Sequence, residues 1–314
     1  MKKTCNVCCH HCALEEGQTG ACGARKNVAG RIVAANYGKL TALALDPIEK
    51  KPLARFRPGT RILSVGSYGC SLRCPFCQNY EIAAAREDPE SGLIQVPETD
   101  PTAQEALSVR RQGVPRMPSG RRRPIEIAEY TPQDLLNLAL DLRPRGNIGI
   151  AFTYNEPLVG WEFARDTAQL FHSAGMKTVL VTNGMASKEV LEQILPHIDA
   201  MNIDLKGFSD AFYRDFAGGS LEMVKNFIAE AVKGCHVELT KLIIPGKNDS
   251  EEEMRQMTAW IAGLREGRGK DIPLHVSRYF PAYRWKEPAT EVAAVYRLAR
   301  IAGETLQYVY TGNC

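Results

Sequence analysis

Short apolar runs rich in β-branched residues alternate with segments of helical periodicity from residue 61 onward. The runs predict strands at 61–65, 148–153, 177–182, 200–205, 236–244 and 272–279, with 306–310 as a further candidate. The segments between them predict helices at 132–142, 161–173, 187–195, 221–233, 251–264 and 290–305. Ser187 and Ser250 are suitable N-caps for two of these helices. Strands and helices that alternate in this way are typical of a mainly parallel sheet.

Six βα units can be counted, which is fewer than a closed eight-fold barrel requires. We therefore predict an α/β fold, a partial (βα)6-type barrel over residues 59–314, with a doubly wound sheet as the alternative. Residues 1–58 lie outside the alternation and predict a small cysteine-rich N-terminal cap, in which 31–45 form a hairpin. Residues 87–124 are dense in Pro, Gly and charge, so we expect a flexible insertion there, or else a substrate lid or docking arm.

Composition narrows the class of protein further. The chain has 314 residues, of which 44% are hydrophobic and 24% charged, and this balance is that of a globular protein. No apolar run approaches the roughly 18 residues of a membrane span, and no apolar stretch follows the N-terminal lysines as in a secretory signal. We therefore expect a cytoplasmic protein without a membrane partner. A net charge of +3, with acidic and basic residues interspersed, gives no argument for a nucleic-acid partner.

Eight of the ten cysteines fall into two groups along the chain. The first group is Cys5, Cys8, Cys9, Cys12 and Cys22, and the second is Cys70, Cys74 and Cys77. In a reducing cytosol, clustered thiols more often bind metal than form disulfides. The sequence therefore predicts two metal sites.

The second group follows the first predicted barrel strand and has the spacing C-x3-C-x2-C. Three thiolates on one loop, Cys70, Cys74 and Cys77, can hold three corners of a 4Fe-4S cluster and leave the fourth iron without a protein ligand. An open coordination position is where substrate chemistry can take place. Zinc is the alternative, but zinc prefers a fourth protein ligand and more often takes paired C-x2-C motifs.

At these three cysteines the sequence resembles the radical S-adenosylmethionine (SAM) superfamily, whose defining motif they match. The resemblance continues at successive strand ends, which is where βα barrels build their active sites. It implies that SAM is held by Tyr154, Asn155 and Glu156, of which the first two replace the usual glycines and Glu156 is the main contact. The further SAM contacts that the resemblance implies are Asn183, Asp204, Lys206, His275 and Arg278.

More specifically, nearly the whole chain resembles the radical SAM enzyme of the AmmeMemoRadiSam system. The segments that carry this resemblance are 10–12, 36–39, 46–53, the cysteine loop, 244–249 and 277–281. The resemblance implies kinship with pyruvate formate-lyase activating enzymes, a low-potential electron donor, and partner proteins of the Memo-like and Ammecr-like kinds. It does not supply the substrate.

The N-terminal group has the spacing C-x2-C-x3-C-x9-C through Cys5, Cys8, Cys12 and Cys22. Four thiolates can close a tetrahedral zinc site, and the metal would order a segment that has little core of its own. An auxiliary Fe–S cluster on the same four residues, serving as an electron relay, is the alternative. Zinc is slightly favoured because four protein thiolates leave no open position. The other Cys and His residues among them are interpreted as bystanders or as groups that support the ligands.

The chemistry implied by the resemblance is reductive cleavage of SAM. SAM would bind the open iron through its amino and carboxylate groups, and one electron would release a 5′-deoxyadenosyl radical that takes hydrogen from a substrate. That substrate would be a protein or peptide if the kinship with activases extends so far. A glycyl-radical-enzyme activase is the first alternative, and an Fe–S electron-transfer or redox-sensing protein is an alternative of another class.

Overall fold

The computed structural model describes residues 1–88, 91, 93–96 and 124–314, so most of the predicted insertion at 87–124 lies outside the described residues. Two short strands, β8 (Arg86–Glu87) and β9 (Ile94–Gln95), form an antiparallel pair where this segment begins. Pro124, where it ends, bridges to Gln95. Both ends of the segment are therefore joined to each other beside the described fold.

One eight-stranded sheet organises the described residues. Its strands in spatial order are β16 (Val309–Gly312), β15 (Leu274–Arg278), β14 (His236–Ile243), β13 (Ala200–Asp204), β12 (Lys177–Thr182), β11 (Asn147–Phe152), β7 (Arg61–Gly66) and β6 (Ala42–Pro47). Neighbouring strands are parallel except β6 and β7, which are antiparallel. The order begins with β16 and ends with β6, so the sheet formed by these strands curls without closing. The predicted partial barrel is confirmed.

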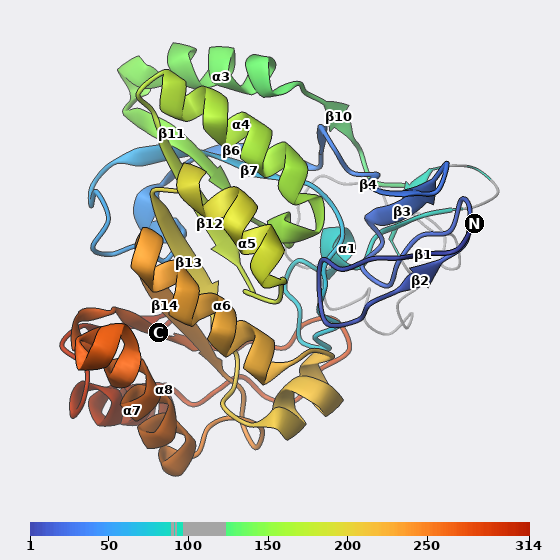
Figure 1. Cartoon of the computed structure of the whole chain (residues 1–314). Helices are drawn as coiled ribbons and strands as arrows, with labels where there is room; N and C mark the ends of the chain where they lie inside the picture. The colour runs from blue at the N-terminus through green and yellow to red at the C-terminus, as the bar shows by residue number, and fades with distance from the viewer. Residues whose placement is uncertain (89–90, 92, 97–123) are drawn as a thin grey trace, which may run out of the picture.

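Six helices cover the outer face of the sheet (Figure 1). They are α3 (Pro132–Asp141), α4 (Trp161–Ser173), α5 (Lys188–Ile194), α6 (Leu221–Gly234), α7 (Glu251–Gly267) and α8 (Val292–Gly303). Ser250 caps α7 as predicted, because its hydroxyl accepts a hydrogen bond from the Glu253 amide at 3.1 Å. Short 3-10 turns lie at η2 (Arg143–Arg145), η4 (Leu195–His197) and η6 (Gly269–Asp271). Within the described ranges, no helix combines the length and the apolar character needed to cross a membrane.

The inner face of the sheet is filled, at the N-terminal ends of the strands, by the segment that follows β6. This segment starts with η1 (Ile48–Lys50), and Ile48 and Leu53 form one apolar cluster with residues of four strands. Those strand residues are Ile62, Ala151, Val179 and Ala200. The Asn202 side chain also donates a hydrogen bond to the Pro52 carbonyl at 2.8 Å. The segment therefore closes one end of the barrel.

The N-terminal cap differs from the prediction in extent. Residues 42–47, which the sequence pattern assigns to the cap, form β6 and pair with β7 along its whole length. This pairing satisfies backbone groups that would otherwise be left at a free strand edge. The hairpin predicted at 31–45 is formed instead by β3 (Arg25–Val28) and β4 (Arg31–Ala34). Its turn, Ala29-Gly30, has φ of 51° and 74°, as a tight hairpin turn requires.

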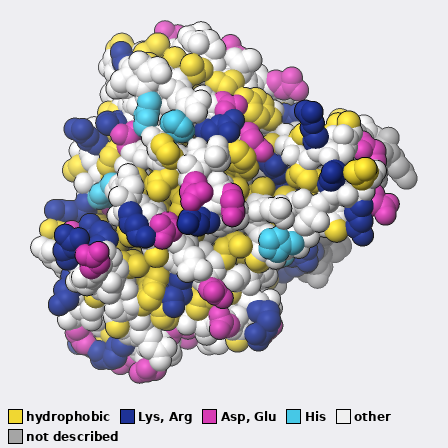
Figure 2. All heavy atoms as spheres, in the orientation of Figure 1, with side chains coloured by type: hydrophobic (Ala, Val, Ile, Leu, Met, Phe, Trp, Pro, Cys, Tyr) yellow, Lys and Arg dark blue, Asp and Glu magenta, His cyan; other side chains and the backbone are white. Residues whose placement is uncertain are grey.

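The remaining short elements attach the cap to the barrel. Strand β1 (Lys3–Thr4) pairs with β2 (Ala13–Leu14), and β5 (Lys39–Leu40) pairs with β10 (Ala128–Glu129). Figure 1 shows the cap beside α1 (Tyr80–Ala83), near the ends of the parallel strands. On the face drawn in Figure 2, Lys and Arg side chains are interspersed with Asp and Glu side chains. This face therefore carries no extended area of one charge sign.

Candidate active site

The loop with Cys70, Cys74 and Cys77 leaves β7 at the end where the parallel strands finish. It begins at Gly69, which has φ of 92°, and a Cβ at this position would lie 2.7 Å from the carbonyl oxygen of Cys22. Glycine suits this position because it adopts positive φ without strain and leaves room for that carbonyl. The Cys70 amide donates a hydrogen bond to the same carbonyl at 3.1 Å. The first cluster cysteine is therefore fixed to the N-terminal cap.

Further backbone hydrogen bonds fix the middle of the loop. The Arg73 amide donates to the Ala217 carbonyl at 2.8 Å, at the end of the π-helix η5 (Phe212–Ala217). The Arg284 amide donates to the Pro75 carbonyl at 2.8 Å. Because the cap, η5 and the segment after β15 all hold the loop, its three cysteines keep a defined arrangement.

The three thiols are close enough to influence one another's ionisation. Burial raises the pKa of all three, that of Cys74 to about 12, and the charges of Cys74 and Cys77 raise the pKa of Cys70 further. The Leu72 amide and the Asn183 side chain donate to the Cys70 sulfur at 3.4 and 3.6 Å, which favours the thiolate. Thiols lose their protons when they bind metal, so this donor set fits a cluster that takes three thiolates.

Glu156, the predicted acidic contact, lies just after β11 and is buried. Its carboxylate accepts hydrogen bonds from the Thr182 hydroxyl at 2.7 Å, the Asn183 amide at 2.8 Å and the Leu158 amide at 3.0 Å. Burial raises the pKa of Glu156 to about 7, although these hydrogen bonds act in the opposite direction. They join the end of β12 to η3 (Pro157–Gly160) and hold the carboxylate beside the cysteine loop.

Asp204 and Lys206 form an ion pair at the end of β13, with 2.7 Å between Nζ and Oδ2. Burial alone would lower the pKa of Lys206, but Asp204 and Cys74 raise it well above its ordinary value. The Lys206 amide donates to the Tyr213 hydroxyl at 3.1 Å. A fixed cation beside Cys74 stabilises negative charge on that sulfur. These contacts place Asp204 and Lys206 next to the cysteines; that they touch SAM stays a prediction.

Asn155 and Tyr154 were predicted to contact SAM, and the structure gives both side chains other partners. The Asn155 side chain donates to the Gly69 carbonyl at 3.1 Å and accepts from the Ser67 amide at 2.9 Å. Tyr154 has φ of 72°, and its hydroxyl donates to Asp46 at 2.7 Å. Asn155 therefore positions the start of the cysteine loop, and Tyr154 joins the end of β11 to β6.

His275 and Arg278 also have partners away from the cysteine loop. The His275 Nε2 atom lies 2.7 Å from a carboxylate oxygen of Glu238, and its ring stacks on Tyr310 at 5.2 Å. The Arg278 Nε–H donates to the Thr290 carbonyl at 2.7 Å. These contacts fix both side chains, and Arg278 uses one of its five N–H donors on Thr290. That His275 and Arg278 touch SAM stays a prediction.

Asp46 and Lys51 form a buried ion pair that the sequence did not predict. The Lys51 ammonium lies 2.8 Å from Asp46 and 4.7 Å from the centre of the Tyr154 ring, and the residue is 2% exposed. The only sequence signal is a charged run at 49–51 between apolar residues. Such a run is more often a solvated surface, so burial could not be inferred from it.

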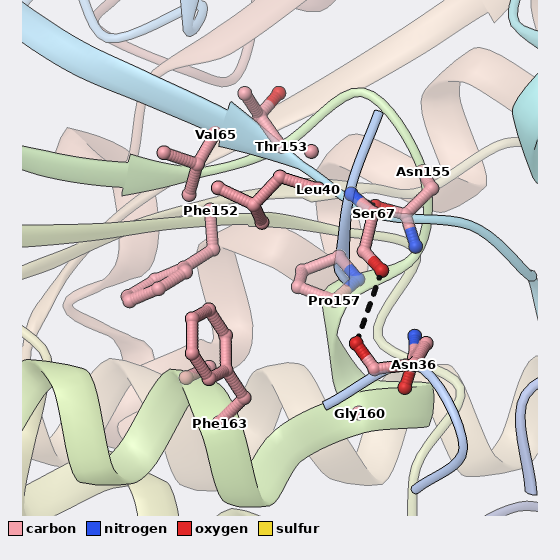
Figure 3. Close-up of a pocket in the computed structure, with 12 residues that line it drawn as sticks. Asn36, Leu40, Val65, Ser67, Phe152, Thr153, Asn155, Pro157, Gly160 and Phe163 are labelled. Carbon is pink, nitrogen blue, oxygen red and sulfur yellow. Dashed lines mark hydrogen bonds between the residues drawn. The ribbon is translucent and has the colours of Figure 1, made fainter. Parts of the chain in front are cut away.

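A small cavity lies behind the site, on the side of the sheet that faces the helices (Figure 3). Val65 and Phe152 from the sheet line it together with Phe163 from α4. Its volume is about 30 Å³, and the Ser67 hydroxyl donates to the Asn36 carbonyl at its edge. A cavity of this size accommodates about one or two water molecules, so it is too small for SAM or a substrate.

An open βα barrel with three clustered thiols on the loop after its first parallel strand is the arrangement of an iron–sulfur enzyme. The sequence pattern of the Radical SAM superfamily matches residues 64–261, more than half of the chain. The chain therefore belongs to the radical SAM superfamily, whose cofactors are a 4Fe-4S cluster and SAM.

The relatives place it within that superfamily. An uncharacterized protein of Methanocaldococcus jannaschii is 36% identical over 316 aligned residues, which cover 99% of this chain and 81% of that protein. The pyruvate formate-lyase-activating enzyme of Clostridium pasteurianum is 27% identical over 213 residues, which cover 66% of this chain and 72% of that enzyme. This chain is a radical SAM enzyme of the group similar to these activating enzymes.

A solved structure shows the same fold. The crystal structure of Streptococcus suis SuiB matches with a TM-score of 0.52 and 13% identity, over 79% of this chain and 48% of that one. At this identity the likeness concerns the fold alone. The closer resemblance to the AmmeMemoRadiSam system stays a prediction.

Proposed function

We propose that this enzyme cleaves SAM reductively at a 4Fe-4S cluster held by Cys70, Cys74 and Cys77. The observation that carries the proposal is the fixed loop that gathers three thiols beside Glu156 and Lys206. When bound, the cluster and SAM supply a 5′-deoxyadenosyl radical that abstracts hydrogen from a substrate. The protein binds and orients these groups and excludes water from them.

Four side chains around the cysteines are our candidates for contacts to SAM. The carboxylates of Glu156 and Asp204 suit a cationic amino group, and the Lys206 ammonium suits a carboxylate. Lys206 uses one of its three donors on Asp204, so other donors remain for a ligand. The Asn183 side chain donates to the Ser71 hydroxyl at 3.2 Å as well as to Cys70, and it fixes the loop on the same side.

A protein or peptide is the substrate class we infer. This inference is supported by the relationship to a pyruvate formate-lyase-activating enzyme, whose name states that it acts on another enzyme. The same relationship favours a glycyl-radical-enzyme activase as the second candidate. Either reaction requires a low-potential electron donor, because SAM cleavage consumes one electron.

We infer two further kinds of partner from the AmmeMemoRadiSam resemblance, namely Memo-like and Ammecr-like proteins. Size-exclusion chromatography of anaerobic mixtures of the purified proteins tests this inference. A shift to a common elution volume supports it, and separate elution at concentrations above about 10 μM contradicts a stable complex. A cytoplasmic location is inferred from the sequence, in which clustered cysteines suit a reducing compartment.

Anaerobic reconstitution with iron and sulfide, followed by dithionite and SAM, tests the main proposal. We expect iron for one 4Fe-4S cluster in the cysteine loop, a change of its electron paramagnetic resonance spectrum on adding SAM, and release of 5′-deoxyadenosine. Cys314→Ser serves as the matched control, because Cys314 is exposed and its sulfur contacts only the nearby Gly312 carbonyl among the described hydrogen bonds. This variant should behave like the wild type.

Two other outcomes contradict the proposal. A cluster that forms but never cleaves SAM under strong reductant supports an electron-transfer or redox-sensing protein instead. Zinc rather than iron in the loop after β7 removes the basis of the radical chemistry. The activase candidate is tested separately with pyruvate formate-lyase as the probe, where a glycyl-radical doublet supports it and no doublet, despite SAM cleavage, counts against it for that protein.

A further inference from the structure

The four N-terminal cysteines predicted as metal ligands surround one small cavity. Cys5, Cys8, Cys12 and Cys22 all line it, although they are spread over the first part of the chain. The Cys5 amide donates to the Cys12 carbonyl at 2.9 Å, which holds the first and third of these residues together. The cavity has a volume of about 10 Å³, close to the minimum that holds a single water molecule. The space therefore suits one ion.

Backbone amides point at the sulfur atoms of this group. The Cys12 sulfur accepts a hydrogen bond from the Ala21 amide at 3.4 Å, and the Cys22 sulfur accepts one from the Arg25 amide at 3.4 Å. Hydrogen bonds to sulfur favour the thiolate, which is the form that binds metal. The cap therefore provides donors to stabilise charged ligands.

Arg25 gives a second and independent indication of negative charge in the cavity. Its side chain lines the cavity and is almost fully buried, with Nη1 paired to Glu162 at 2.7 Å. The Nε–H group of Arg25 is buried and has no hydrogen-bond partner among the described residues. An unpaired buried donor costs about 1–3 kcal/mol. Metal-bound thiolates beside it would provide the acceptor that this Nε–H group lacks.

The other Cys and His residues of the segment are engaged elsewhere. The Cys9 sulfur donates to the Met185 sulfur at 3.7 Å, and the His10 Nε2 atom lies 2.8 Å from the Ser71 carbonyl. His11 is exposed. His10 also lines the cavity, but its Nε2 atom is turned to the Ser71 carbonyl, and Cys9 and His11 are not among the lining residues. The thiols that line the cavity are therefore those of Cys5, Cys8, Cys12 and Cys22.

We propose that Cys5, Cys8, Cys12 and Cys22 bind one zinc ion. Four thiolates in a closed site are the ligand set that zinc takes in structural sites. A cubane of four irons and four sulfides is much bulkier than one ion, so the small volume of the cavity favours the single ion. In the part of the chain that the structure describes, no three Cys, His, Asp or Glu side chains already stand close enough to hold an ion. Zinc binding therefore requires the four thiols to turn inward and to lose their protons.

The zinc site is joined directly to the cysteine loop of the active site. The Cys70 amide donates to the Cys22 carbonyl, and His10 contacts the Ser71 carbonyl. The two proposed metal sites are therefore linked by hydrogen bonds between their own residues or immediate neighbours. Because zinc has no redox chemistry, its part here is to fix this junction rather than to relay electrons. This second step rests on the proposed cluster at Cys70, whereas the zinc site itself does not.

Metal analysis tests the zinc site without any measurement of activity. We expect one zinc per chain in the purified protein, released when p-hydroxymercuribenzoate blocks the thiols and detected with a chromogenic chelator. Cys12→Ser should lose this zinc. Cys9→Ser is the matched control, because Cys9 lies among the ligands in sequence but contacts Met185, and this variant should keep the zinc.

Several outcomes overturn the zinc site. Iron in place of zinc, as one ion or as a second cluster, contradicts the proposal. A Cys12→Ser variant that retains its zinc also contradicts it. If Cys12→Ser does not fold, the zinc content per chain of the wild type and of Cys9→Ser still tests the site, and less than one zinc per chain in both contradicts it. A protein that keeps one zinc but never assembles a cluster contradicts the proposed function and leaves the zinc site standing.

The junction is tested by reconstituting Cys12→Ser with iron and sulfide. We expect several-fold lower cluster occupancy and a broadened electron paramagnetic resonance signal in the presence of SAM, while Cys9→Ser matches the wild type. The same occupancy and spectrum in both variants would mean that the zinc site does not position the cysteine loop.

Discussion

The two ends of the barrel use buried polar groups in opposite ways. At the C-terminal ends of the strands, here called the mouth, the loop gathers buried thiols such as Cys70 and Cys74, which we propose as ligands of a cluster. At the N-terminal ends, here called the base, Lys51 is paired with Asp46 and Glu238 is paired with His275. Groups that the protein satisfies itself stabilise the fold, and groups left to a cofactor serve the reaction. Substitutions at the mouth should therefore affect activity, and those at the base should affect stability.

The largest expected effect is at the mouth. Cys74→Ser removes one of the three proposed cluster ligands, and we expect release of 5′-deoxyadenosine to fall below detection. The free energy of unfolding of the metal-free protein should change by only roughly 1 kcal/mol, because serine is similar in size to cysteine. Product analysis after anaerobic reconstitution, together with urea unfolding, measures both quantities. Cleavage at a rate near that of the wild type would show that the mouth is not built around this thiol.

At the base, Lys51→Met should have the reverse effect. The substitution removes the buried cation from Asp46, which keeps the Tyr154 hydroxyl, and breaking a buried ion pair costs about 3–5 kcal/mol. Lys50→Met is the matched control, since the Lys50 side chain is 68% exposed and lies 3.5 Å from the same carboxylate. An exposed pair contributes less than about 1 kcal/mol. Urea unfolding of both variants tests the difference, and equal losses of stability would contradict the contrast between burial and exposure.

The same contrast explains what the sequence could predict. The alternation of strands and helices and the spacing of Cys70, Cys74 and Cys77 are local patterns, and both the barrel and the loop after β7 could be read from them. The partners of His275 could not, because they depend on which strand lies beside β15 and on where Glu238 falls in β14. Strand β6 was not predicted for a similar reason, since its pairing with β7 depends on long-range contacts.

The segment after β6 illustrates this limit. Its charged residues resemble a surface turn in sequence, yet Lys51 is buried and the amides of Ala54 and Arg55 donate to Glu238 at 2.9 and 2.8 Å. Ile48 and Leu53 carry these groups into the barrel by packing on the inner face of the sheet. Long-range packing of this kind leaves no periodic signal within a short window of sequence.

Low pH should destabilise the N-terminal end of the barrel, here called the base, because it protonates Glu238. Burial alone would raise its pKa, but hydrogen bonds from His236, His275 and the amides of Arg55 and Ala54 lower the pKa to about 2. A lowered carboxyl pKa stabilises the fold fully above its ordinary value of 4.5 and loses that contribution as the pH falls toward 2. The stability of the wild type relative to Glu238→Gln should therefore shrink by roughly 3 kcal/mol across this window.

Urea unfolding of the metal-free proteins at a series of pH values measures this effect. Glu222→Gln, at an exposed position of α6, is the control and should follow the wild type at every pH. A constant difference between the wild type and Glu238→Gln from pH 4.5 to 2 would contradict the lowered pKa on which this prediction depends.

The smallest expected effect lies at the junction of the mouth with the cap, where stability and activity should change together. Gly69 and Gly59 both have positive φ, of 92° and 80°. A Cβ at Gly69 would lie 2.7 Å from the Cys22 carbonyl, whereas nothing lies within 4 Å of one at Gly59.

Gly59→Ala therefore isolates the effect of the backbone conformation, a loss of about 1 kcal/mol in the free energy of unfolding, and Gly69→Ala should lose roughly 1 kcal/mol more. Only Gly69→Ala should also lower cluster occupancy, because relief of the clash displaces the bond from the Cys70 amide to the Cys22 carbonyl. Iron content and urea unfolding of the two variants measure both effects. Equal iron content would show that the contact between Gly69 and the Cys22 carbonyl does not affect cluster binding.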